Sequence, residues 1–164
     1  MARVIGIDPG LQHTGWAVID SQGSSIKFLG AGVIHTLPGN SLPSRLLQIH
    51  NELAKVIVQY CPNDAAIEDT YINKNYASSL KLGHARAASI LTLCINGLIP
   101  AEYPAKVIKR AIVGSGKADK TQVAYMLKFL VPLAGELASD ASDALAVAIC
   151  HSNYTSADQN RIAS

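Results

Sequence analysis

The sequence predicts a mixed α/β fold, in which helices pack on both faces of a single five-stranded sheet. Three apolar segments separated by short turns open the chain, and strand-like and helical patterns alternate after them. Strands that come first and are followed by alternating strands and helices favour a mixed sheet covered by helices. A chain of 164 residues with 49% hydrophobic residues can bury a sizeable core. We therefore expect one domain over residues 1–154 and a polar tail over 155–164.

The first half of the chain predicts three strands and a helix. Apolar runs at 3–8, 14–20 and 26–36 are separated by turns, one around Gly10 and one in "SQGSS". The pattern then changes to helical spacing over 42–60, where Pro43 near the start is tolerated because its missing N–H needs no partner there. The apolar stripe of this helix consists of Leu42, Leu46, Ile49, Leu53, Val56 and Tyr60.

The second half alternates short strands with helices. "AAIED" (65–69) is a short buried strand, and a long helix is expected from about 75 to 96, with Gly97 as its stop. A fifth strand is expected at 98–103. Three further helices are expected over 105–113, 119–130 and 141–152, and the remaining tail is polar and expected to fray.

The distribution of charge indicates a polyanionic partner. The net charge is only +2, but residues 70–128 contain nine Lys or Arg and two acids. A solvated, lysine-rich face is the alternative. Three widely spaced cysteines favour a reducing compartment. No secretory leader is expected, because Asp8 and Pro9 interrupt the apolar N-terminus, so we expect the protein in the cytoplasm.

Four acids are candidates for a functional site. Asp8 and Glu68 each end an apolar strand, where an unpaired carboxylate is costly to bury. Asp140 and Asp143 are three residues apart at the start of a helix and so share one face. Taken separately, each has a simpler explanation, because strand-end acids often belong to turns and acids in a first helical turn are favoured by the helix dipole.

Taken together, the four acids point to metal-dependent chemistry. Adjacent central strands could present Asp8 beside Glu68, and a helix over that edge could bring Asp140 and Asp143 to them. Clustered carboxylates repel one another unless cations neutralise them, and Mg²⁺ prefers such oxygen ligands. Two ions about 4 Å apart stabilise the attacking and leaving oxygens of a phosphoryl displacement. An acidic metal site beside a basic segment suits a nuclease.

Three motifs are similar to the RuvC-type Holliday junction resolvases of bacteria: "IGIDPG…TGWAVI", "AIEDTYINKN…LKLGHAR" and "SDASDALAVAICH". The resemblance runs from about residue 3 to residue 151. It implies a ribonuclease H-like fold and a Mg²⁺-dependent endonuclease, with about two ions per site and Mn²⁺ as a substitute. It also implies a homodimer that resolves four-way DNA junctions by paired incisions in recombination and repair, together with the RuvA–RuvB branch-migration complex. The matching catalytic and metal-binding positions are Asp8, Glu68, Asp140 and Asp143.

The same resemblance assigns DNA contacts to residues outside the acidic set. Tyr71 would stack on bases at the crossover, although a loop aromatic often only folds back onto the core. Lys74 would touch phosphate or simply keep its loop soluble. Lys109 and Lys120 match basic positions near the active site, although isolated surface lysines are common. Weaker candidates in the basic segment are Arg86, Lys106, Arg110 and Lys117.

Several alternatives remain open from the sequence. The opening hairpin also resembles the phosphate hairpin of actin-like ATPases and sugar kinases, but the chain lacks their length and second glycine-rich turn. "GSGKADKT" is not a phosphate loop, because Ala111 and Ala118 stand where the pattern needs Gly and Ser or Thr. A non-catalytic DNA-binding protein and a nuclease of the same fold acting on other nucleic acids are further alternatives. The apolar helix over 77–95 is either a dimer surface or a fully buried central helix.

Overall fold

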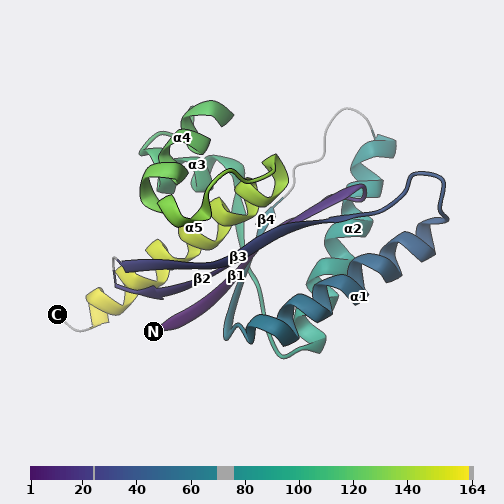
Figure 1. Ribbon diagram of the computed structural model, residues 1–164, viewed down its shortest axis with the longest axis horizontal. Helices are drawn as coiled ribbons and strands as arrows, with labels where there is room; N and C mark the ends of the chain where they lie inside the picture. Colours follow the sequence, from purple (N-terminus) through teal and green to yellow (C-terminus); the bar gives the residue numbers. More distant parts are fainter. Residues whose placement is uncertain (24, 70–75, 163–164) are drawn as a thin grey trace.

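The computed structural model describes residues 1–23, 25–69 and 76–162, and side chains as far as Thr155. Figure 1 shows how the strands and helices follow one another. In chain order they are β1 (Ala2–Asp8), β2 (His13–Gln22), β3 (Ser25–His35), α1 (Leu42–Tyr60), β4 (Asp64–Asp69), α2 (Tyr76–Ile95), β5 (Ala101–Pro104), α3 (Ala105–Val113), α4 (Lys120–Leu130), the short 3-10 helix η1 (Pro132–Ala134) and α5 (Ser139–Ile162).

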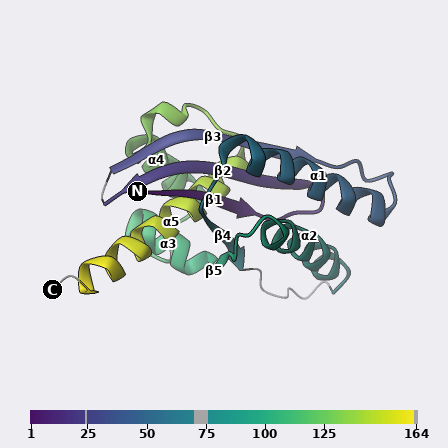
Figure 2. The same cartoon turned by 90° about the horizontal axis from the view of Figure 1, so that it is seen from below.

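The five strands form one sheet in the order β3-β2-β1-β4-β5, which Figure 2 shows side by side. The first three strands pair antiparallel as a meander, because short turns connect them. The strands β4 and β5 join parallel to β1, and the crossovers between them contain α1 and α2. The predicted mixed five-stranded sheet is therefore confirmed.

Helices cover both faces of the sheet, as predicted (Figure 1). The helices α3, α4 and α5 pack on one face with the core residues Val4, Ala17 and Ala66. The helices α1 and α2 cover the other face, over Ile5, Val18 and Ile67. Successive residues of a strand alternate between the two cores, as pleated strands require. No helix within the described residues is long and apolar enough to cross a membrane.

Two elements differ from the sequence-based expectation. Strand β5 begins at Ala101 rather than residue 98, because Leu98 forms part of the cap that follows the last residue of α2, Ile95. There the N–H of Leu98 donates to Leu93 O at 3.0 Å and Gly97 adopts φ 80°, a Schellman cap that buries Leu98. Helix α5 continues to Ile162 rather than ending at Ser152, since no Gly or Pro interrupts residues 153–162.

The alternative of a fully buried helix over residues 77–95 is wrong. Helix α2 packs against α1 along one side. Its other side leaves Leu80, Leu91 and Ile95 exposed, each above half of its maximum. Large apolar side chains that recur on one exposed helical face typically mark an interaction surface.

Helix α5 lies unusually close to the sheet because glycines stand below it. A β-carbon at Gly15 of β2 would overlap the carbonyl oxygen of Asp140. A β-carbon at Gly6 of β1 would lie 2.6 Å from the backbone nitrogen of Ala148 and would also overlap Ala144 O. Both obstacles are backbone atoms, which cannot rotate away. The absence of two side chains therefore sets the height of α5 above the sheet.

We predict that Gly15→Ala displaces the first turn of α5. The added methyl group forces the backbone of Asp140 to move, which costs about 1–3 kcal/mol of the free energy of unfolding. Denaturant unfolding measures this loss. Gly39→Ala is the matched control, because nothing lies within 4 Å of a β-carbon at Gly39 and its φ is not positive. Equal stabilities of the two variants would contradict the close contact.

Candidate active site

Two neighbouring strands bring the first pair of acids together. The strands β1 and β4 are parallel, with Ile7 opposite Ile67, and Asp8 and Glu68 are the next residues on each. Gly6 and Ala66 face α5, so Asp8 and Glu68, two residues further along, face the same way. The pair therefore stands at the carboxyl ends of the two central strands, beneath α5.

Helix α5 supplies the other two acids from its first turns. Asp143 lines the same cavity as Asp8 and Glu68. Asp140 does not line this cavity, but its charge is near enough to raise the pKa of Asp8. The two aspartates reach the sheet edge because α5 passes directly over Gly15 and Gly6. The four acids are thus brought to one place by three elements distant in the sequence.

The cavity between these acids and helices α3 and α4 has a volume of about 230 Å³. Lys109 of α3 and Lys120 of α4 line it as well, so two cationic side chains share the cavity with the carboxylates. Its remaining wall is apolar, which excludes water from part of the site and strengthens charge interactions there. The lining residues are Asp8, Glu68, Ala105, Ile108, Lys109, Lys120, Val123, Asp143 and Ala146.

The acids perturb one another strongly. The pKa of Asp8 rises from 3.8 to about 8, first because the carboxyl is buried and then because Glu68, Asp143 and Asp140 are negative. The pKa of Glu68 is also raised, first by burial and then by the charge of Asp143. Lys120 opposes both effects without cancelling them. The negative charge of the site is therefore not fully balanced by nearby positive charge.

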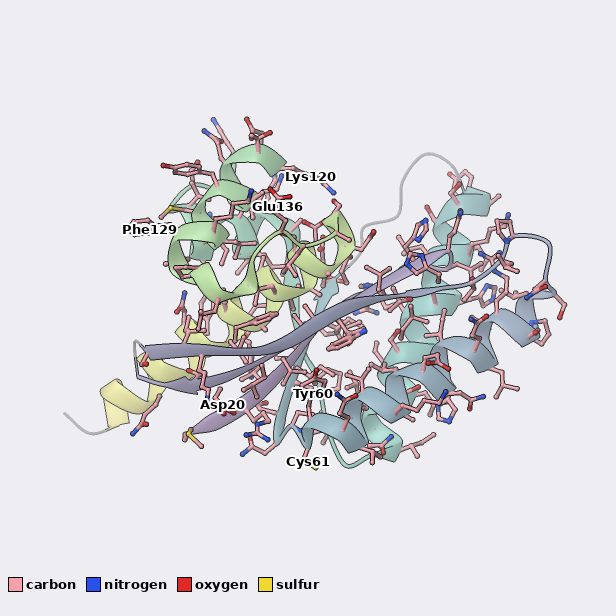
Figure 3. All side chains as sticks on the ribbon, in the orientation of Figure 1. Asp20, Tyr60, Cys61, Lys120, Phe129 and Glu136 are labelled. Carbon is pink, nitrogen blue, oxygen red and sulfur yellow. The ribbon has the colours of Figure 1, made fainter. Side chains whose placement is uncertain are left out.

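Lys120 supplies part of that charge. Its Nζ lies 3.0 Å from Asp143 Oδ2, and this hydrogen bond is the main cause of the raised pKa of Lys120. Figure 3 shows Lys120 on the side of the sheet where α3, α4 and α5 pack. Within the described residues, no three acidic, His or Cys side chains converge closely enough to make a preformed metal site. The donor chemistry nevertheless fits a hard divalent cation, because the carboxylate charge exceeds what Lys120 compensates.

The other predicted site residues lie outside this cavity or outside the described part of the chain. Tyr71 and Lys74 lie outside the described residues. Lys106, Arg110 and Lys117 are exposed on α3 and in the turn that follows it. Arg86, a weaker candidate for DNA binding, forms ion pairs with Asp69 and Glu102.

Sequence reasoning missed the apolar wall of the cavity and the contacts around β4. Ile108 and Val123 followed ordinary helical spacing, so nothing distinguished them from other core positions. His151, which the sequence left unassigned, is buried, and its Nε2 lies 2.9 Å from Asp64 Oδ2 at the start of β4. Its Nδ1 is 2.9 Å from the Tyr103 hydroxyl. These contacts help to fix α5 over β4 and β5.

Comparison with known proteins identifies related sequences over nearly the whole chain. The family described as "Crossover junction endodeoxyribonuclease RuvC" matches residues 4–151. A protein with that name from Gluconobacter oxydans is 49% identical over 154 residues, which cover 94% of this chain and 92% of the relative. Another from Rhodopseudomonas palustris is 45% identical over 157 residues, with 96% and 90% coverage.

Solved structures agree with the sequence comparison. RuvC of T. thermophilus in complex with a Holliday junction substrate superimposes with a TM-score of 0.89 at 28% identity, covering 96% of this chain and 97% of that one. The yeast mitochondrial Holliday junction resolvase Ydc2 has a TM-score of 0.68 at 13% identity, covering 98% and 83%, and shares the fold.

We predict that the metal-free protein is less stable at pH 8 than at pH 5. Between pH 4 and 8 folded Asp8 keeps a proton that the unfolded chain releases, so raising the pH lowers the free energy of unfolding. The expected loss is about 1–3 kcal/mol, allowing for screening by solvent at the cavity mouth. Denaturant unfolding across this pH range, in the presence of a chelator, measures it.

The Asp8→Asn variant is the control for this pH effect, since it removes the group that titrates. Its stability should change less between pH 5 and 8 and should exceed that of the natural chain at pH 8. An unchanged pH profile in Asp8→Asn would show that Asp8 is not the source of the destabilisation.

Proposed function

The chain belongs to the RuvC family of crossover junction endodeoxyribonucleases, and from this premise we propose that it resolves four-way DNA junctions by metal-dependent hydrolysis. The observation that carries the proposal is the cavity that Asp8, Glu68 and Asp143 line together with Lys109 and Lys120. A protein that only binds DNA gains nothing from carboxylates that face phosphate. The structural relative bound to a Holliday junction supports the junction as substrate.

The four acids are the proposed ligands of the catalytic cation. Asp8, Glu68 and Asp143 would hold it from within the cavity, and Asp140 from its margin. Mg²⁺ suits these oxygen ligands, and we propose two ions per site with Mn²⁺ as a substitute. When bound, such ions supply Lewis-acid polarisation of the scissile phosphate.

The remaining roles at the site are proposed for basic and aromatic side chains. Lys109 and Lys120 carry positive charge in the cavity that Asp8 and Glu68 also line, where they would neutralise phosphate oxygens. Lys120 holds Asp143 by a 3.0 Å contact, and it would be freed for phosphate when a cation takes over that carboxylate. Tyr71 is proposed to stack on unpaired bases at the crossover and Lys74 to contact the backbone.

The working unit is proposed to be a homodimer. One protomer has one acidic cavity among its described residues, whereas resolution needs two matched incisions. Leu80, Leu91 and Ile95 form an exposed apolar stripe on α2 that a second copy could cover around a two-fold axis. The RuvA–RuvB complex is proposed as a partner from the family relationship. The three cysteines are free thiols, which suits the reducing bacterial cytoplasm.

We predict that Asp8→Asn lowers Mg²⁺-dependent junction cleavage by more than about 100-fold, because the site loses a charge that a cation needs. Junction binding should persist or tighten, since a negative charge that faces phosphate has gone. Labelled junction, fork, duplex and single-stranded DNA, each with Mg²⁺, Ca²⁺ or chelator, provide the measurement. Glu52→Gln, which changes a half-exposed carboxylate on α1, is the control. Near-normal cleavage by Asp8→Asn would refute the site, and equal cleavage of all four DNAs would refute junction selectivity.

For the dimer, we predict that Leu91→Asp with Ile95→Asp yields a monomer in sedimentation experiments, because two charges in an apolar contact prevent its burial. A supercoiled plasmid with a cruciform reports paired incision: the natural chain should linearise it, whereas the variant should only nick it. Leu133→Asp, on the opposite side of the sheet and equally apolar before the change, should still linearise the plasmid. A dimeric double variant would refute the assignment of α2.

A further inference from the structure

The end of strand β4 presents acids to both faces of the sheet. Glu68 faces α5 and the cavity, so its neighbour Asp69 faces α1 and α2, on the same side as Ile67. Strand β5 places Glu102 directly opposite Ile67, and parallel partners project to the same side. Asp69 and Glu102 therefore form a second acidic pair, on the face opposite the cavity.

Arg86 of α2 lies between these two acids. Its Nη2 is 3.5 Å from Asp69 Oδ1 and also contacts Glu102 Oε2. Only 20% of the Arg86 side chain is exposed, compared with 40% for Asp69 and 52% for Glu102. Of the three charges, the cation is the most buried. An arginine held in this way joins three elements: α2, the last residue of β4 and the edge strand β5.

We propose that Arg86 is a positioning residue for cleavage. From the α2 face of the sheet it holds the carboxyl ends of β4 and β5 together, and so it keeps Glu68 and Lys109 in place. The proposal rests on the proposed function for its activity readout, although the hold of Arg86 on the two strands can be tested without cleavage. Arg86 does not touch the cavity; it acts through Asp69 on Glu68 and through Glu102 on β5.

Side chains hold this corner of the sheet on both faces: Tyr103 of β5 reaches His151 of α5, and Glu102 reaches Arg86 of α2. Strand β5 is an edge strand of four residues, and α3 starts at the residue after it. Lys109 lies in the second turn of α3, so movement of β5 is passed directly to that side of the cavity. Without the guanidinium, Asp69 and Glu102 would repel one another at the point where Glu68 must be fixed.

The first test compares Arg86→Met with Arg3→Met in steady-state junction cleavage. Arg3 forms a similar ion pair with Asp20, 2.7 Å apart, and Figure 3 shows Asp20 far from Lys120. Both variants lose one positive charge, so general attraction to DNA changes equally. We expect Arg86→Met to lower kcat about 10- to 100-fold and to raise the Mg²⁺ concentration for half-maximal rate, with KM unchanged. Arg3→Met should keep the natural kcat and Mg²⁺ requirement.

Conservative variants separate positioning from general stability. Arg86→Lys keeps one charge and should recover part of kcat, whereas Glu102→Gln removes only the link to β5 and should lower kcat less than Arg86→Met. Glu102 is half exposed, so this variant is expected to fold even if Arg86→Met does not. A raised KM with unchanged kcat in Arg86→Met would identify a DNA contact instead and overturn the proposal. Kinetics of Glu102→Gln identical to those of the natural chain would also overturn it.

The second test needs no substrate. Hydrogen exchange of the β4 and β5 amides should become faster in Arg86→Met or Glu102→Gln, while exchange in β2 and β3 stays unchanged. In Arg3→Met, the β4 and β5 amides should remain protected. If the natural chain cleaves no junction, the proposed function fails. The exchange rates still test whether Arg86 holds β4 and β5 in place. Unchanged protection of β4 and β5 would overturn this role of Arg86 even in an active enzyme.

Discussion

The close approach of α5 to strands β1 and β2 is the contact on which the site depends. Gly6 and Gly15 leave room for the backbone of α5 at Ala144, Ala148 and Asp140. A helix held further from the sheet by two methyl groups would carry Asp140 and Asp143 away from Asp8 and Glu68. The same contact buries Leu145 and Ile149 completely, so the core that stabilises the fold also holds the acids together.

That arrangement has an electrostatic cost which the rest of the fold must offset. Burial and mutual repulsion raise the pKa of Asp8 to about 8 and also raise the pKa of Glu68, so the charged form of each carboxyl is less stable here than in a free side chain. Lys120 relieves only part of the repulsion, mainly at Asp143. The two apolar cores supply the stability that keeps such a site folded without its cation. A site that is strained when empty binds cations more strongly, because binding removes the repulsion.

Much of this arrangement could be predicted from the sequence, because strand-end acids and apolar periodicity are local signals. Asp8 and Glu68 ended short apolar strands, and two parallel neighbours necessarily align their carboxyl ends. The departure at the start of β5 has a local cause that the apolar pattern did not reveal. The apolar character of Leu98 suggested a strand, although the residue closes the end of α2 through its bond to Leu93. The roles of Gly15 and Arg86 depend on packing partners that no local pattern reveals.

The two faces of the sheet contribute to the site in different ways. The face under α5 carries the charges that would bind cation and phosphate, and there Lys120 pairs with Asp143. The opposite face holds the strand ends still, through Arg86 on one side of α2. The other side of α2 presents Leu80, Leu91 and Ile95 outward. A second protomer bound to that stripe would therefore restrain α2, the helix whose Arg86 contacts β4. The contact between protomers and the placement of Glu68 would then both depend on α2.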